Sequence, residues 1–202
     1  MIDFYTASTV NGFKVAIALE ELGLPYTVHD LNLGELEQKK PDYLKINPNG
    51  RIPAIVDRES GTAIFESGAC LVYLADKTGK LTGATPEARG RVNSWVFLHY
   101  FGEDLPRVVD RYVNETKRLY NIFNEQLATN EWLAGEYSIA DIAMFPWAII
   151  TDYANVSLDD YPHVKAWTER MRARPAVQRG LGVPPKREIA DRAAAAQAIL
   201  QR

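Results

Sequence analysis

The sequence predicts a small α/β domain with a mixed sheet, followed by an all-helical domain. Three observations support this prediction. In roughly the first eighty residues, short apolar strands alternate with amphipathic helices in the order β-α-β-α-β-β-α. After a stretch that contains two glycines and a proline, no strand pattern recurs. With 202 residues, the chain is also long enough for two small domains with cores of their own.

The first half of the α/β domain reads as one strand–helix–strand unit. Residues 2–5 suit a short strand, and the apolar residues that follow keep a helical spacing until Gly23. Residues 26–31 are expected to be extended. The charged stretch 36–46 is weakly helical and is interrupted by Pro41. A βαβ unit implies two parallel strands joined by a helical crossover.

The second half of this domain reads as a hairpin followed by a helix. Two short apolar runs, 54–56 and 63–65, flank a polar turn, which is typical of an antiparallel pair at the edge of a sheet. The helix after the hairpin closes near Gly79. We therefore place the α/β domain at residues 1–79 and a linker at residues 80–85.

Residues 86–202 are predicted to form the all-helical domain. Helices are expected over residues 109–127, 138–153 and 162–172, where apolar residues recur at core-facing positions. Pro175 can open a final short helix at its first turn. The alanine-rich end, residues 190–200, is either a frayed helix or a packed tail.

Composition and charge exclude several classes of protein. A net charge of −3 argues against a nucleic-acid partner, since such proteins normally carry a basic patch. No apolar run approaches the ~18 residues that suggest a membrane span, and the acidic N-terminus lacks the features of a signal peptide. The single cysteine rules out an intramolecular disulfide and a Cys-x-x-Cys pair. We expect a soluble cytoplasmic protein.

Glu66 and Ser67 follow an apolar strand at the point where a helix begins. Ser67 can cap that helix, and the free N–H groups there also attract a carboxylate. Glu66 adds a negative charge that favours an ammonium group. The pair therefore either binds both charges of an amino-acid α-carbon or is a plain capped helix beside a solvated acid.

Pro53 directly precedes the predicted buried strand 54–56, and proline has no amide hydrogen to donate to the sheet. An X–Pro bond can be held cis at modest cost. A cis turn here can leave the N–H and C=O of Ile52 facing outward, so that a peptide ligand adds to them as a strand. The alternative is a proline that simply opens an edge strand.

The loop from the first strand into the first helix contains Ser8, Thr9 and Asn11. Ligands of open α/β sheets bind outside the carboxyl ends of the strands, where such loops lie. Hydroxyl and amide groups at a helix N-terminus can donate to a thiolate and lower its pKa. The alternative is that Thr9 or Asn11 is only an N-cap.

Other conspicuous residues are interpreted as structural. Ser138 and Asp141 have the spacing of a capping box, followed by an apolar run. Cys70 lies among apolar residues of a predicted helix, where buried thiols are usually inert. The three histidines show no metal-ligand spacing, so no metal is expected.

Four stretches together resemble the glutathione S-transferase family across nearly the whole chain: NPNGRIPAIVD, IFESGACLVYLAD, EWLAGEYSIADIAMFPW and WTERMRARPAV. The opening, TASTVNGFKVAIALEELG, is similar to the Nu class of bacterial enzymes with disulfide-bond reductase activity, and to the yeast nitrogen-regulation prion protein. The resemblance implies a thioredoxin-like glutathione-binding domain followed by a helical domain.

The resemblance also implies roles for single residues. Glu66 and Ser67 would bind the γ-glutamyl end of glutathione, and Ile52, preceding cis-Pro53, would pair with the cysteinyl backbone. The other implied contacts are Gln38 at the glycyl end, Asn11, Thr9 or Ser8 near the sulfur, and Arg111 at the ligand of a neighbouring subunit. Which of the three residues near the sulfur polarises it stays open.

In this class the protein uses no cysteine of its own, and two glutathione molecules, or glutathione disulfide, can share a site. The implied protein is a homodimeric transferase with disulfide-bond reductase activity, acting on a small electrophile or disulfide. Two alternatives stay open: a glutathione-dependent isomerase of the same fold, which Ser8 favours, and a non-catalytic regulatory protein.

Overall fold

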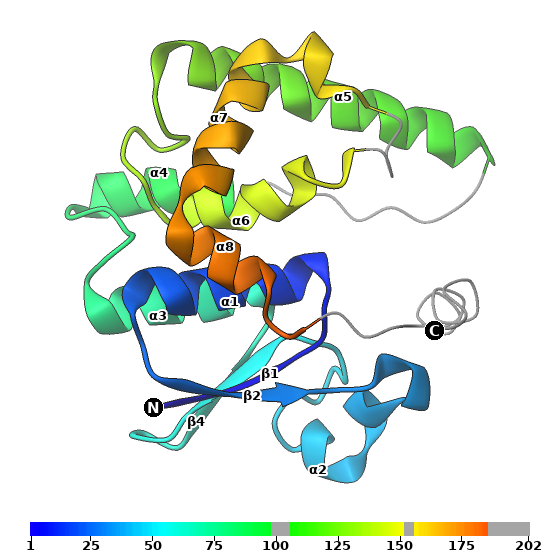
Figure 1. Ribbon diagram of the computed structural model, residues 1–202, viewed down its shortest axis with the longest axis vertical. Coiled ribbons are helices and arrows are strands. Elements are labelled where there is room, and N and C mark those ends of the chain that lie inside the picture. The colour runs from blue at the N-terminus through cyan, green and yellow to red at the C-terminus, as the bar shows by residue number, and fades with distance from the viewer. Residues whose placement is uncertain (98–105, 152–155, 186–202) are drawn as a thin grey trace. The chain divides into compact units, whose positions relative to one another are not determined.

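A computed structural model describes residues 1–97, 106–151 and 156–185 (Figure 1). The chain divides into two compact units. One joins Met1–Leu74 to the segment that begins at Ala176, and the other spans Ala75–Pro175. The sequence-based boundaries at residues 79 and 86 stay a prediction.

The first unit contains a four-stranded mixed sheet with strand order β2-β1-β3-β4. The strands are β1 (Ile2–Thr6), β2 (Tyr26–Asp30), β3 (Ala54–Asp57) and β4 (Thr62–Phe65). Strands β1 and β2 are parallel, whereas β3 pairs antiparallel with both β1 and β4. The predicted parallel pair and the predicted edge hairpin are both confirmed.

Helices cover the sheet on both sides. In Figure 1, α1 (Val10–Leu22) and α3 (Ser67–Thr78) lie on one side of it, and the short α2 (Pro41–Leu44) lies on the other. Alternate residues of β1 are buried and those between them are half-buried, so one face of the sheet is covered more fully than the other. Helix α1 ends at Gly23, whose φ of 64° is the left-handed conformation that glycine adopts most readily. The weakly helical stretch becomes α2 and two 3₁₀ turns, η1 (Leu33–Glu35) and η2 (Glu37–Lys39).

Helix α8 (Pro175–Leu181) packs on α1. A Cβ on Gly180 would lie 2.6 Å from the Cα of Ile17, so only a glycine permits this approach. The Nε of Arg179 donates to the Glu20 carboxylate at 2.6 Å, and the Tyr26 hydroxyl donates to the same carboxylate at 2.6 Å. These contacts join the segment after Ala176 to the sheet unit.

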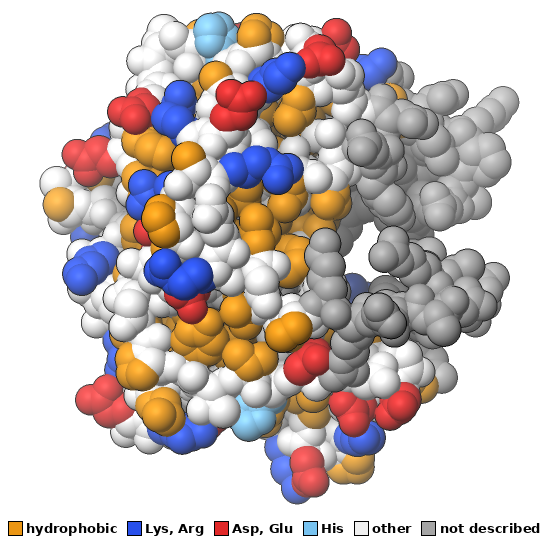
Figure 2. Space-filling model, viewed as in Figure 1, with side chains coloured by type: hydrophobic (Ala, Val, Ile, Leu, Met, Phe, Trp, Pro, Cys, Tyr) orange, Lys and Arg blue, Asp and Glu red, His pale blue; other side chains and the backbone are white. Residues whose placement is uncertain are grey.

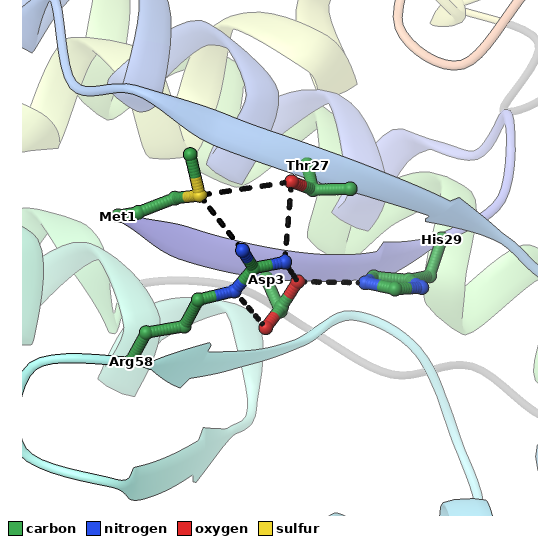
Figure 3. A network of polar contacts seen from close by, with 5 residues as sticks. All are labelled: Met1, Asp3, Thr27, His29 and Arg58. Carbon is green, nitrogen blue, oxygen red and sulfur yellow. Dashed lines mark hydrogen bonds and ion pairs between the residues drawn. The ribbon is translucent and has the colours of Figure 1, made fainter.

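A polar network lies on the less buried face of the sheet, where Asp3 of β1 points (Figure 3). The Arg58 guanidinium donates to both carboxylate oxygens of Asp3, at 2.6 and 2.7 Å, and a ring nitrogen of His29 lies 2.8 Å from the same carboxylate. The guanidinium also contacts the sulfur of Met1 and the hydroxyl of Thr27. The Arg58 guanidinium holds the pKa of Asp3 down at about 2.

The second unit is helical in its described residues. It contains α4 (Pro86–Val96), α5 (Pro106–Thr129), α6 (Ile139–Ala148) and α7 (Pro162–Ala173). Helix α4 packs on α6, and α5 packs on α7. Helix α6 is shorter than the predicted 138–153, because its last turn tightens and the Ile150 N–H donates to the Trp147 carbonyl. Residues 152–153 and the alanine-rich end lie outside the described residues.

The capping box of α6 is confirmed. The Ser138 hydroxyl accepts from the Ala140 N–H at 3.2 Å, and the Asp141 carboxylate accepts from the Ser138 N–H at 3.1 Å. The carboxylate is fully buried and accepts two further hydrogen bonds, from the Leu133 N–H at 3.1 Å and the Trp167 ring N–H at 2.9 Å. Burial outweighs these bonds and raises the pKa of Asp141 to about 6.

Candidate functional site

Two side-chain hydrogen bonds stabilise the loop of residues 47–53, which we call the cis-proline loop. The Arg51 carbonyl accepts from the Tyr43 hydroxyl at 2.5 Å and from the Asn47 side-chain amide at 2.7 Å. Asn47 is buried, and burial raises the pKa of Tyr43 to about 12, so its hydroxyl stays a donor. The Ile52–Pro53 peptide bond is cis, as predicted.

The main chain of Ile52 is available to a ligand. No other described residue forms a hydrogen bond with its N–H or its C=O. Strand β3 begins only at Ala54, so the ladder with β1 stops short of Ile52. An extended peptide can satisfy both groups at once by adding as a strand.

The acid corner, which we define as Glu66 and Ser67, follows β4 and starts α3. Glu66 has a φ of 70°, a conformation that is uncommon outside glycine and is often found at functional sites. Its carbonyl accepts from the Cys70 N–H at 2.9 Å. The N–H groups of Ser67, Gly68 and Ala69 have no acceptor among the described residues. Together with the dipole of α3 they offer the donors and the partial positive charge that an anion requires.

The acid corner is tied to two other loops. The Ser67 hydroxyl donates to the side-chain oxygen of Asn11 at 3.5 Å, which is its only hydrogen bond to a described residue. The Glu66 carboxylate accepts from the side-chain amide of Asn49 at 3.2 Å. The hydroxyl of Ser67 therefore does not cap its own helix, which favours a role in binding over the plain cap.

The first loop brings three candidate groups to the start of α1. The Thr9 hydroxyl accepts from the Gly12 N–H at 3.2 Å, so Thr9 is the N-cap of α1 and still has its own hydroxyl hydrogen to donate. The Asn11 oxygen accepts from Ser67, which leaves its NH₂ group as a donor. Ser8 is exposed and forms no hydrogen bond with a described residue.

Gln38 lies in η2, beside the cis-proline loop. A Cβ on Gly50 would lie 3.0 Å from the Gln38 carbonyl oxygen, and the Lys39 ammonium donates to the Asn49 carbonyl at 3.3 Å. The side-chain oxygen of Gln38 is buried and has no hydrogen-bond partner among the described residues. Such a group is uncommon in folded proteins and is a place where a ligand can supply the missing donor.

These contacts connect the predicted site residues of the first unit into one cluster. Asn11 joins Ser67, Glu66 joins the cis-proline loop, and this loop joins the segment of Gln38. Arg111 falls within α5, in the other unit, and its side chain lies outside the described residues. The sequence analysis missed Asn49 and Lys39, although Asn49 stands inside the NPNGRIPAIVD stretch that was singled out.

Cys70 offers no thiolate. It is fully buried in α3, its thiol donates to the Ile64 carbonyl at 3.5 Å, and burial raises its pKa to about 12. The part of the chain that the structure describes contains no group of three or more His, Cys, Asp or Glu side chains arranged to hold a metal ion. Sulfur chemistry at the cluster would therefore depend on a sulfur that the ligand brings.

Surface charge is mixed. Figure 2 shows acidic and basic side chains interspersed over the visible face, in keeping with the small net charge of the chain. Among the described helices, none combines the length and apolar character needed to cross a membrane.

The mixed sheet, the cis-proline loop and the helical unit define a two-domain protein whose first domain has the thioredoxin-like fold. Residues 11–77 match the family model of the glutathione S-transferase N-terminal domain, and residues 94–175 match that of the C-terminal domain. The chain belongs to the glutathione S-transferase family.

Individual relatives agree with this assignment. The disulfide-bond oxidoreductase YfcG of Escherichia coli is 40% identical, in an alignment that covers 90% of this chain and 94% of the relative. A glutathione transferase of Burkholderia graminis, crystallised with two glutathione molecules per subunit, is 39% identical with a TM-score of 0.83 and covers 92% of this chain and 89% of its own. Ure2p in complex with S-hexylglutathione is 28% identical with a TM-score of 0.81, covering 89% and 97%.

Proposed function

We propose that the protein is a glutathione-dependent enzyme that carries out thiol–disulfide exchange, with addition of glutathione to an electrophile as a second reaction of the same thiolate. The observation that carries this proposal is the combination, in one unit, of the unpaired main chain of Ile52 with the acid corner. Two relatives described above support it, the disulfide-bond oxidoreductase YfcG and the Burkholderia graminis transferase with bound glutathione.

Each polar end of glutathione has a complementary group in the cluster, and so does its cysteinyl main chain. Its γ-glutamyl carboxylate suits the hydroxyl of Ser67 and the free N–H groups at the start of α3, and its ammonium suits Glu66. Its cysteinyl main chain suits the N–H and C=O of Ile52. Its glycyl end suits the side chain of Gln38, whose buried oxygen lacks a donor.

The protein's contribution to the chemistry is to favour the thiolate of the bound glutathione. A free thiol with a pKa near ~8.5 is only a few per cent ionised at neutral pH. The hydroxyl of Thr9 and the NH₂ group of Asn11 are the donors that the first loop offers, beside the N-terminus of α1. Lowering the pKa of the thiol by one unit needs about 1.4 kcal/mol, which one or two such hydrogen bonds supply.

The exchange then needs two glutathione molecules and no protein cysteine. The bound thiolate attacks one sulfur of a disulfide, the S–S bond breaks, and the other sulfur leaves as a thiolate that takes up a proton. A second glutathione thiolate attacks the mixed disulfide and releases the second thiol, so that glutathione disulfide is the oxidised product. The two glutathione molecules in the Burkholderia graminis enzyme are consistent with this stoichiometry.

Assembly and compartment belong to the same proposal. We infer a cytoplasmic homodimer in which Arg111 reaches the ligand of the neighbouring subunit. The regulatory alternative differs from the proposal in one respect, since it keeps the ligand site and lacks turnover of disulfide or electrophile.

Ser67→Ala tests the site. We expect this change to weaken glutathione binding about tenfold, the size of one hydrogen bond to a charged group, and to leave the unfolding midpoint nearly unchanged. Ser60→Ala, in the exposed β3–β4 turn, is the matched control and should change neither quantity. Loss of fold and ligand together would make Ser67 a structural residue. A wild-type protein that neither binds glutathione nor reduces a small disulfide would refute the proposed function.

A further inference from the structure

Asn49 contacts three other segments or residues of the cluster, and the proposed function assigns it no role. Its side-chain amide donates to Glu66 at 3.2 Å, its own N–H donates to the side chain of Asn47 at 3.0 Å, and its carbonyl accepts from Lys39 at 3.3 Å. These partners come from the turn before α3, from the cis-proline loop itself and from η2. Asn49 is therefore fixed from two sides through its main chain, while its side chain reaches toward the acid corner.

Glu66 needs such a partner. It is exposed, and among the described residues its carboxylate has no hydrogen-bond partner other than Asn49. A long, exposed acidic side chain otherwise samples several rotamers, and each must be given up when a ligand binds. A hydrogen bond from a fixed amide limits this freedom before the ligand arrives.

We propose that Asn49 is a positioning residue that holds the Glu66 carboxylate ready for the α-ammonium group of the ligand, so that the site selects peptides with a free α-ammonium over those without one. This inference rests on the proposed function. Asn49 acts through Glu66 and does not touch the reacting sulfur. One oxygen of the carboxylate accepts from Asn49, and the other oxygen remains for the ammonium group.

The geometry separates this role from simple support of the loop. Two of the three hydrogen bonds of Asn49 use main-chain atoms, which Asn49→Ala retains. The alanine variant therefore removes the link to Glu66 and leaves the loop attached to Asn47 and Lys39. A role in loop support predicts equal weakening of every ligand that pairs with Ile52, whereas a role in positioning Glu66 predicts weakening only of ligands that carry the ammonium group.

The test measures binding of two ligands by calorimetry: glutathione, and glutaryl-cysteinyl-glycine, which is glutathione without its amino group. For Asn49→Ala we expect about three- to tenfold weaker binding of glutathione, the size of one exposed hydrogen bond to a charged group, and unchanged binding of the analogue. In a Glu66→Gln background, Asn49→Ala should have no further effect on glutathione, because the two residues act as one unit.

Two variants complete the test. Asn49→Asp keeps the size of the side chain and places a second carboxylate beside Glu66, so it should weaken glutathione binding at least as much as alanine does, even if the alanine variant folds poorly. Asn130→Ala, at the end of α5, is a matched control that should bind both ligands normally. Equal losses for both ligands, or no loss for glutathione, would overturn the role of Asn49 alone. Failure of the wild type to bind either ligand would overturn the proposed function and this inference with it.

Discussion

Asp141→Asn is the sharpest test of the energetics of the helical unit. Asp141 is fully buried, and its carboxylate accepts hydrogen bonds from Leu133, Ser138 and Trp167. Asparagine keeps the shape and one acceptor oxygen, but it turns an NH₂ group toward one of these donors. Leaving one buried donor unsatisfied costs about 1–3 kcal/mol.

The charge contributes in the opposite direction. Burial raises the pKa of Asp141 from 3.8 to about 6, so between these values the folded state binds more protons than the unfolded state. Stability from this group is therefore fully present below pH 3.8 and is lost as the pH rises to about 6. A shift of about two pKa units corresponds to about 3 kcal/mol. The asparagine variant is uncharged and does not undergo this loss.

We therefore expect the stability advantage of the wild type over Asp141→Asn to shrink by about 2 kcal/mol between pH 4 and pH 6.5. The assay is urea unfolding followed by circular dichroism at fixed protein concentration, which keeps any contribution from assembly constant. Asp160→Asn, at an exposed position, is the matched control. A difference that stays constant or grows with pH would show that the three hydrogen bonds outweigh burial, and would refute our account of this carboxylate.

Two further predictions concern the sheet unit. Asp3→Asn removes a carboxylate whose pKa the Arg58 guanidinium lowers from 3.8 to about 2; the stability that this group adds is present above pH 3.8 and is lost as the pH falls toward 2. Acid titration of unfolding should show the wild type and Asp3→Asn converging in that window, and parallel curves would contradict the assignment. Asn11→Ala should raise the pKa of bound glutathione by about one unit, read from the thiolate absorbance against pH, whereas Ser8→Ala should not. Equal effects of the two changes would remove Asn11 from its role.

Local chemistry explains why much of the fold followed from the sequence. Gly23 follows the last residue of α1 in the left-handed conformation, and Pro53 precedes β3 with the cis bond that the family resemblance implied. The capping box of Ser138 and Asp141 spans only four residues, so its pattern is visible in the chain. Each of these features depends on one residue and its immediate neighbours.

The contacts that build the site are long-range, and no local pattern contains them. Ser67 meets Asn11 from 56 residues away, and Glu66 meets Asn49 from 17 residues away. The addition of α8 to the sheet unit likewise depends on Gly180 meeting Ile17. Sequence reasoning could name the ends of most of these contacts by residue type. It could not pair them, because pairing depends on how the elements pack.

The two kinds of feature differ in what a substitution can change. Ile52 and the first turn of α3 offer main-chain groups, which every residue type except proline provides. In the proposed function these groups bind the main chain and the carboxylate of an extended peptide. In the proposed function, the side chains of Glu66, Asn49 and Asn11 then determine which charged groups the site accepts and how the sulfur of the ligand is polarised. Since Cys70 is buried with a raised pKa, the proposed sulfur chemistry requires a sulfur atom that the ligand brings. It follows that changes at these three side chains should alter ligand choice and rate while the main-chain groups still bind the peptide, which separates specificity from binding at the level of single residues.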